Sequence, residues 1–177
     1  MVYTEDKTAW PTMVKLAGCL CTTLAERGLP TPCVCTPVPG PLAVMDQCNS
    51  CGKSKSDCGG QAWVRLTSEY PSSVFPGADT DQASCGAPDA YVLEVGVARC
   101  QPTGSANGIN GYTAPTMEQL VDATRLQMAD KAAIRAAIKC CMDDEDSDYT
   151  YVLGTYQPIQ VAGDCGGGFW TVTIWSV

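Results

Sequence analysis

The sequence predicts one α+β domain over residues 1–177, in which an N-terminal helix and one long helix pack on a mixed or antiparallel sheet of about four to five strands. Two segments carry apolar residues at helical spacing, and several shorter segments have the apolar pattern of strands. Their order along the chain is helix, strands, long helix and two strands. The length is that of one domain, and neither an internal repeat nor a linker divides it.

The N-terminal helix is predicted from about residue 12 to residue 27. Gly28 and Pro30 follow it, and both are residues that commonly end helices. Its apolar face, which we assign to the core, repeats at spacings of four and three: Met13, Ala17, Leu20 and Leu24. The four prolines of segment 30–40 then exclude a helix and favour an extended, edge-like course.

Three strands are predicted in the next part of the chain, at 42–45, 61–67 and 91–99. Segment 61–67 alternates, so one face should lie in the core while Trp63, Arg65 and Thr67 face the other way. The segments 70–90 and 101–112 have no period and are interrupted by Pro or Gly. We interpret them as long surface loops, of the kind that often carries contacts with partners.

The long helix is predicted from near Pro115 to about Cys141. Thr113 or Thr116 would cap it, and Thr116 with Gln119 fits a capping box. The apolar stripe predicted to face the core contains Met117, Val121, Thr124, Met128 and Ala132, widened by Leu120, Ala123, Ile134, Ala137 and Ile138. Because adjacent helical side chains point in different directions, at most one of Cys140 and Cys141 should face the core.

Two strands close the chain. The first is predicted at 149–154, and the second lies in a hairpin with Trp170, Val172 and Ile174 facing one way. The glycines at 166–168 are not followed by a helix, so a phosphate-binding loop backed by a helix N-terminus is not available.

The composition excludes several classes of enzyme. The chain has twelve cysteines and no histidine, which removes Ser-His-Asp and Cys-His catalysis. No cysteine lies in a sequence context that indicates a reactive thiol, so we predict no catalytic activity and no cofactor. Eleven basic and nineteen acidic residues give a net charge of −8, which disfavours charge-driven binding to DNA. No segment has the roughly 20 apolar residues of a membrane span, and residues 1–7 lack signal-peptide features, so we expect synthesis in the cytoplasm and no membrane partner.

Two groups of residues are candidate sites. Cysteines in a cytoplasmic protein suggest burial, late oxidation or metal binding. The zinc alternative would use Cys48, Cys51, Cys58 and Cys85, but the second Cys-x2-Cys pair of a zinc site is missing, and we predict no metal. The other group is an acidic cluster without the Gly and Glu of a calcium loop, formed by Asp143, Asp144, Glu145, Asp146 and Asp148.

Three blocks resemble a known family, together with the N-terminal helix and the cysteine segment that follows it. They are Cys58-Gly-Gly-Gln-Ala-Trp-Val-Arg-Leu, Pro115-Thr-Met-Glu-Gln-Leu before a helix ending Cys140-Cys141, and Cys165-Gly-Gly-Gly-Phe-Trp-Thr-Val-Thr-Ile. They resemble head-to-tail connector proteins of long-tailed actinobacteriophages (siphophages), most nearly the tail terminators. The resemblance covers nearly the whole chain in element order.

The resemblance implies a subunit that forms a hexameric ring, caps the tail tube, stops its polymerisation and offers a surface to head-completion proteins. It carries over no catalytic residue. The protein would be assembled in the host cytoplasm and reside in the virion at the head–tail junction, where disulfides could form after lysis.

Within such a ring, the acidic cluster would line the lumen or rim and let genomic DNA pass without specific binding. Candidate subunit contacts are Phe75, Trp170 and Trp175, with segment 169–175 as an edge strand. Two alternatives stay open. One is another connector subunit, a stopper or adaptor, and the other is a cytosolic zinc-binding interaction module.

Overall fold

A computed structural model describes residues 6–40, 59–80, 88–107, 111–143, 149–162 and 165–176. The elements in chain order are α1 (Ala9–Glu26), β1 (Val34–Pro37), β2 (Gln61–Pro71), β3 (Asp89–Cys100), β4 (Ser105–Asn107), β5 (Gly111–Thr113), α2 (Met117–Met142), β6 (Tyr149–Ala162) and β7 (Cys165–Ser176). The predicted α+β class and order of elements are confirmed. The strand predicted at 42–45 lies outside the described residues.

The main sheet is mixed and has five strands in the order β1-β2-β3-β7-β6. The short strand β1 runs parallel to β2, and the other neighbours are antiparallel. Strand β7 lies between β3 and β6, so the prediction that segment 169–175 forms an edge strand is wrong. The outermost described strand on that side is β6, whose register with β7 shifts between Leu153 and Tyr156 and again between Ile159 and Ala162.

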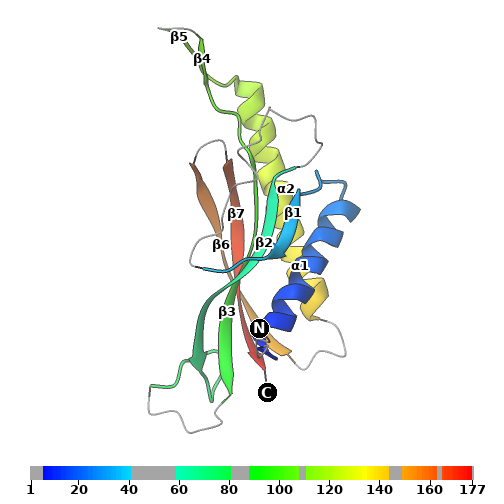
Figure 1. The fold of residues 1–177 in the computed structure, drawn as a ribbon, viewed down its shortest axis with the longest axis vertical. Coiled ribbons are helices and arrows are strands. Elements are labelled where there is room, and N and C mark those ends of the chain that lie inside the picture. The colour runs from blue at the N-terminus through cyan, green and yellow to red at the C-terminus, as the bar shows by residue number, and fades with distance from the viewer. Residues whose placement is uncertain are drawn as a thin grey trace, which may run out of the picture.

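The two predicted loops differ in part from the structure. Tyr70 and Pro71 end strand β2 and residues 89 and 90 begin β3, so the described part of the first loop is shorter than the predicted 70–90. The second segment, 101–112, contains β4 and most of β5, which pair as a small hairpin. Figure 1 shows this hairpin extending beyond the main sheet, beside the N-terminal end of α2.

The main core lies between the sheet and the two helices, which cover the same face of it (Figure 1). All four apolar residues predicted for the first helix are buried: Met13, Ala17, Leu20 and Leu24. Val95 and Val97 from β3, Val172 and Ile174 from β7, and Ile134 and Ile138 from α2 complete the centre of this core. The burial predicted for these strands and for Ile134, Ala137 and Ile138 of α2 is therefore confirmed.

The N-terminal half of α2 contradicts the predicted stripe. The capping box is present, with the Gln119 amide donating to Thr116 Oγ1 at 3.2 Å and the Thr116 amide donating to Gln119 Oε1 at 2.9 Å. Met117, Val121 and Met128, however, are 78%, 40% and 47% exposed. The buried residues of α2 begin only at Asp130. The reason is geometric, because the first turns of α2 extend past the sheet and have no core surface beneath them (Figure 1).

The face of the sheet opposite the two helices is also covered near β2, and the alternating pattern did not predict this. Trp63 is 1% exposed and packs against Gly96, where a Cβ atom would collide with the indole ring. Arg65 is 8% exposed and pairs with Glu94 on β3. Strand β2 is therefore buried on both faces at its start, and only its later residues reach solvent.

Disulfides join the helices to each other and to the sheet. Cys19 on α1 is bonded to Cys141 on α2, and Cys21 on α1 is bonded to Cys35 on β1. Three further cysteines, Cys33, Cys100 and Cys165, are also disulfide-bonded. Cys140 is an exposed free thiol and Cys141 is buried, which confirms that only one of this pair faces the core.

Candidate functional site

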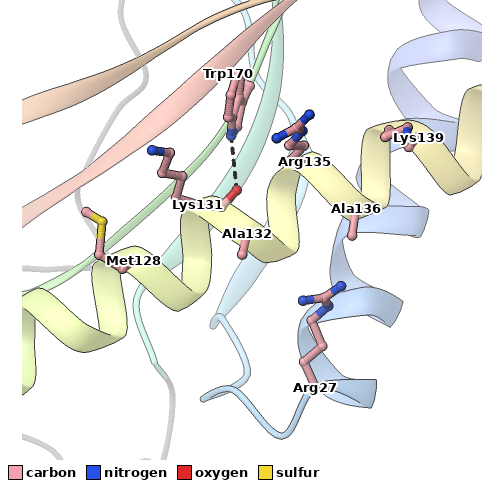
Figure 2. Close-up of a pocket in the computed structure, with 8 residues that line it drawn as sticks. All are labelled: Arg27, Met128, Lys131, Ala132, Arg135, Ala136, Lys139 and Trp170. Atoms are coloured by element: carbon pink, nitrogen blue, oxygen red, sulfur yellow. Dashed lines mark hydrogen bonds between the residues drawn. The ribbon is translucent and has the colours of Figure 1, made fainter.

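A basic groove lies on the outer side of α2, with a volume of about 580 Å³. Figure 2 shows its lining, which comes from the end of α1, the middle of α2 and strand β7. The lining residues are Arg27, Met128, Lys131, Ala132, Arg135, Ala136, Lys139 and Trp170. The groove therefore combines four cationic side chains with one aromatic ring and no acidic residue.

Helical spacing gives the groove its shape. Lys131, Arg135 and Lys139 are four residues apart and project from one side of α2 (Figure 2). Ala132 and Ala136 follow them on the adjacent row, where their short side chains leave a hollow. Arg27, at the C-terminal end of α1, supplies the fourth cation. The apolar period along α2 predicts Ala132 in the core, and this is wrong, because Ala132 is exposed in this hollow.

Aromatic rings from the sheet hold two of the cations. The indole N–H of Trp170 donates to the backbone carbonyl of Lys131 at 3.0 Å, which fixes the ring against α2 (Figure 2). The Arg135 guanidinium lies 5.8 Å from the centre of the Trp170 ring, and the Lys131 ammonium lies 5.3 Å from that of Tyr156. Cations over aromatic faces are attracted by the ring quadrupole. Part of the charge in the groove is thus preorganised before any ligand arrives.

The charge of the groove is not neutralised within the described residues. Its four cations are four of the eleven basic residues in a chain of net charge −8. The described ion pairs use other residues: Arg65 with Glu94, Arg99 with Asp130, and Arg125 with Asp122. Like charges four residues apart on a helix destabilise it by about 0.2–0.5 kcal/mol per pair. The arrangement can bind carboxylate or phosphate groups, which Arg recognises through paired hydrogen bonds.

The acidic cluster predicted at the end of the long helix is described at one residue only. Asp143 caps the C-terminal end of α2, and its carboxylate accepts a hydrogen bond from the Tyr151 hydroxyl at 2.6 Å. Burial, followed by this carboxylate, raises the pKa of Tyr151 to about 12. Asp144, Glu145, Asp146 and Asp148 lie outside the described residues, as do Cys48, Cys51, Cys58 and Cys85. Within the described ranges, no three His, Cys, Asp or Glu side chains are grouped to hold a metal ion.

The three predicted subunit contacts fall at two places. Phe75 stacks on Trp175 with ring centres 6.0 Å apart, and the Trp175 indole N–H donates to the Ser72 carbonyl at 3.0 Å. These contacts hold the segment after β2 against β7. Trp170 lies apart from them in the wall of the basic groove. The structure therefore brings Phe75 and Trp175 together and separates Trp170 from both.

Sequence reasoning missed the basic groove, although its signal is visible in the chain. The signal is the cation at every fourth position from Lys131 to Lys139, with no acidic residue among the nine. The contributions of Arg27 and Trp170 could not be read from spacing, because they come from α1 and β7.

No protein-family model matches the chain, and no curated protein matches it significantly. None of the helices in the described ranges is long and apolar enough to cross a membrane.

Proposed function

We propose that this protein is a structural subunit at the head–tail junction of a siphophage, where it forms a ring that caps the tail tube, stops its polymerisation and joins it to head-completion proteins. Its role is structural rather than catalytic, and it needs no cofactor. The observation that carries the proposal is the exposed N-terminal half of α2, with the hairpin of β4 and β5 beside it. The described part of the subunit does not cover this half of the helix.

This part of the fold offers apolar surface that the subunit itself does not cover. The apolar stripe, which we define as Met117, Leu120, Val121 and Met128, lies on about three turns of one helix, and each of its side chains is 40% exposed or more. Burying one such side chain completely contributes about 1.5–3 kcal/mol. Contiguous exposed apolar surface commonly marks a protein–protein interface. A neighbouring subunit or the tail tube would cover this stripe.

The charge of the chain fits a ring through which DNA passes. A net charge of −8 repels phosphate, so an acidic lumen would leave DNA free to slide. The basic groove would then lie away from the lumen, at a contact between proteins. The α+β fold, with two helices on one face of a five-stranded mixed sheet, is compatible with the small subunit that the resemblance implies.

The proposal can be tested with purified tail tubes and native mass spectrometry. We expect a particle near six times 18.7 kDa, in solution or on tubes, and tubes that stop growing once it is bound. Val121→Asp should abolish capping without lowering the melting temperature, because the stripe is exposed. Asp122→Asn, which alters charge about 100° around the helix from Val121 and outside the stripe, should cap normally. Wild-type protein that binds neither tubes nor itself would contradict the proposal, and binding only to portal-side proteins would indicate a stopper or adaptor.

A further inference from the structure

The basic groove can bind carboxylates, and the subunit carries a group of exposed carboxylates at the opposite end of α1. We define the acidic corner as Asp6, Glu69 and Asp89. In the β2–β3 register Glu69 pairs with Tyr91 and Pro71 pairs with Asp89, so the two carboxylates lie diagonally on one face of the sheet. Asp6 lies at the N-terminal end of α1, where its carboxylate accepts hydrogen bonds from the Thr8 and Ala9 amides at 2.8 and 3.2 Å.

The three carboxylates act on each other and are not neutralised within the described residues. Burial, and then the charges of Asp89 and Asp6, raise the pKa of Glu69. All three residues are exposed, and none of them forms a described ion pair. Lys7 is next to Asp6 in sequence but makes no described ion pair with the corner either. The corner is therefore an accessible anionic surface that an external cation would stabilise.

The acidic corner and the basic groove lie at opposite ends of α1. Asp6 precedes the first turn of this helix, and Arg27 of the groove follows its last turn. A helix of 18 residues is about 27 Å long at roughly 1.5 Å per residue. Each subunit therefore presents charges of opposite sign that form no ion pair within the described ranges, separated by about the length of α1.

We propose that the basic groove of one subunit receives the acidic corner of a second copy of this chain, so that subunits associate head to tail. A contact between two different surfaces repeats from subunit to subunit, and it closes into a ring when the rotation allows. Carboxylates fit the groove because Arg27 and Arg135 can each form paired hydrogen bonds with them. A DNA backbone is the less favourable occupant, because the net charge of the chain opposes its approach. This inference rests on the proposed ring and names its subunit contact.

Charge reversal gives a direct test, with association measured by sedimentation velocity and native mass spectrometry at low and high salt. Arg135→Glu reverses a charge in the groove, and Asp89→Lys reverses one in the corner. Each variant alone should associate at least about tenfold more weakly than wild type, and wild-type association should weaken with salt. Lys15→Glu is the matched control, since this exposed residue lies on α1 outside the groove, the acidic corner and the apolar stripe, and its substitution should leave association unchanged.

Mixing the two variants sharpens the test. In an alternating assembly, the Glu at position 135 of one variant meets the Lys at position 89 of the other, and the remaining contact keeps its natural charges. We therefore expect an equimolar mixture of Arg135→Glu and Asp89→Lys to recover association that neither variant shows alone. Circular dichroism and melting temperatures establish that each variant is folded before it is mixed.

Several results would overturn the inference. They are unchanged association of Arg135→Glu, a mixture no better than its components, wild-type protein that stays monomeric at high concentration and low salt, or Arg135→Glu losing affinity for a DNA duplex while still associating. Tail-tube capping is scored separately. A protein that associates through these charges but does not cap tubes would refute the proposed function alone, and one that caps tubes with every charge variant would refute this contact alone.

Discussion

The buried ion pair between Arg99 and Asp130 gives the sharpest prediction about stability. The guanidinium of Arg99 on β3 donates to both carboxylate oxygens of Asp130 on α2, at 2.6 and 2.7 Å. The two side chains are 4% and 7% exposed. Arg99 also donates to the backbone carbonyls of Pro30 and Gly59, so this one side chain links β3, α2 and the segments beside β1 and β2.

Replacing Asp130 with Ala leaves the guanidinium buried without its counter-charge. Breaking a buried pair in this way costs about 3–5 kcal/mol. Because the Pro30 and Gly59 carbonyls still accept from Arg99, we expect a loss near the lower end, about 3 kcal/mol, or roughly a hundredfold in the folding equilibrium. The double variant Arg99→Met with Asp130→Leu buries no charge but removes the donor to the Pro30 and Gly59 carbonyls, so it should recover only part of the loss.

Urea denaturation followed by far-ultraviolet circular dichroism, with the disulfides intact, measures this loss of stability. It appears as a lower urea concentration at the unfolding midpoint, with an unchanged dependence of the unfolding free energy on urea. Asp122→Asn is the control, because its pair with Arg125 is exposed on both sides and contributes less than about 0.5 kcal/mol. The reasoning is refuted if Asp130→Ala costs less than about 1 kcal/mol, or if the double variant is no more stable than the single one.

Three further predictions concern other parts of the fold. Thr116→Ala removes the cap of α2 and should lower the free energy of unfolding by about 1 kcal/mol, and an unchanged urea midpoint would show that the cap does not stabilise the helix. Cys19→Ala with Cys141→Ala opens a link between residues 122 positions apart and should cost about 4–5 kcal/mol in the chain-entropy account; calorimetry measures this, and a melting temperature equal to that of wild type would contradict it. Burial raises the pKa of Tyr91 to about 12, so the neutral phenol stabilises the fold below pH 10 and this stability is lost between about pH 10 and 12. Tyr91→Phe should flatten that loss in urea midpoints measured across this range, and an equally steep decline in the variant would assign it to other groups.

Local signals predicted most of the elements. The α1 stripe from Met13 to Leu24 was found because its apolar residues all face one core, and the capping box at Thr116 was found because it needs only four consecutive residues. The alternation of β3 and β7 identified Val95 and Val172 as core residues. These features depend on neighbours in sequence, so the sequence alone was sufficient.

The parts that sequence reasoning missed depend on where elements end in space. The stripe beginning at Met117 has the same period as a core face, but periodicity does not show whether a sheet lies beneath it. Trp63 and Arg65 follow the pattern of an outer face and are nevertheless buried, because Gly96 and Glu94 on β3 receive them. The basic groove needs residues from three elements, so only their packing reveals it.

Strand β6 has a consequence for how copies of this protein can meet. It is 14 residues long and lies outermost among the described strands on its side, but two register shifts and Pro158 interrupt its ladder. An uninterrupted edge can recruit strand after strand without limit, as fibrils do, whereas a broken one offers no continuous template. Copies joined through side chains instead form a closed ring when the rotation between them allows it. The irregularities of β6 therefore disfavour open-ended growth by strand pairing.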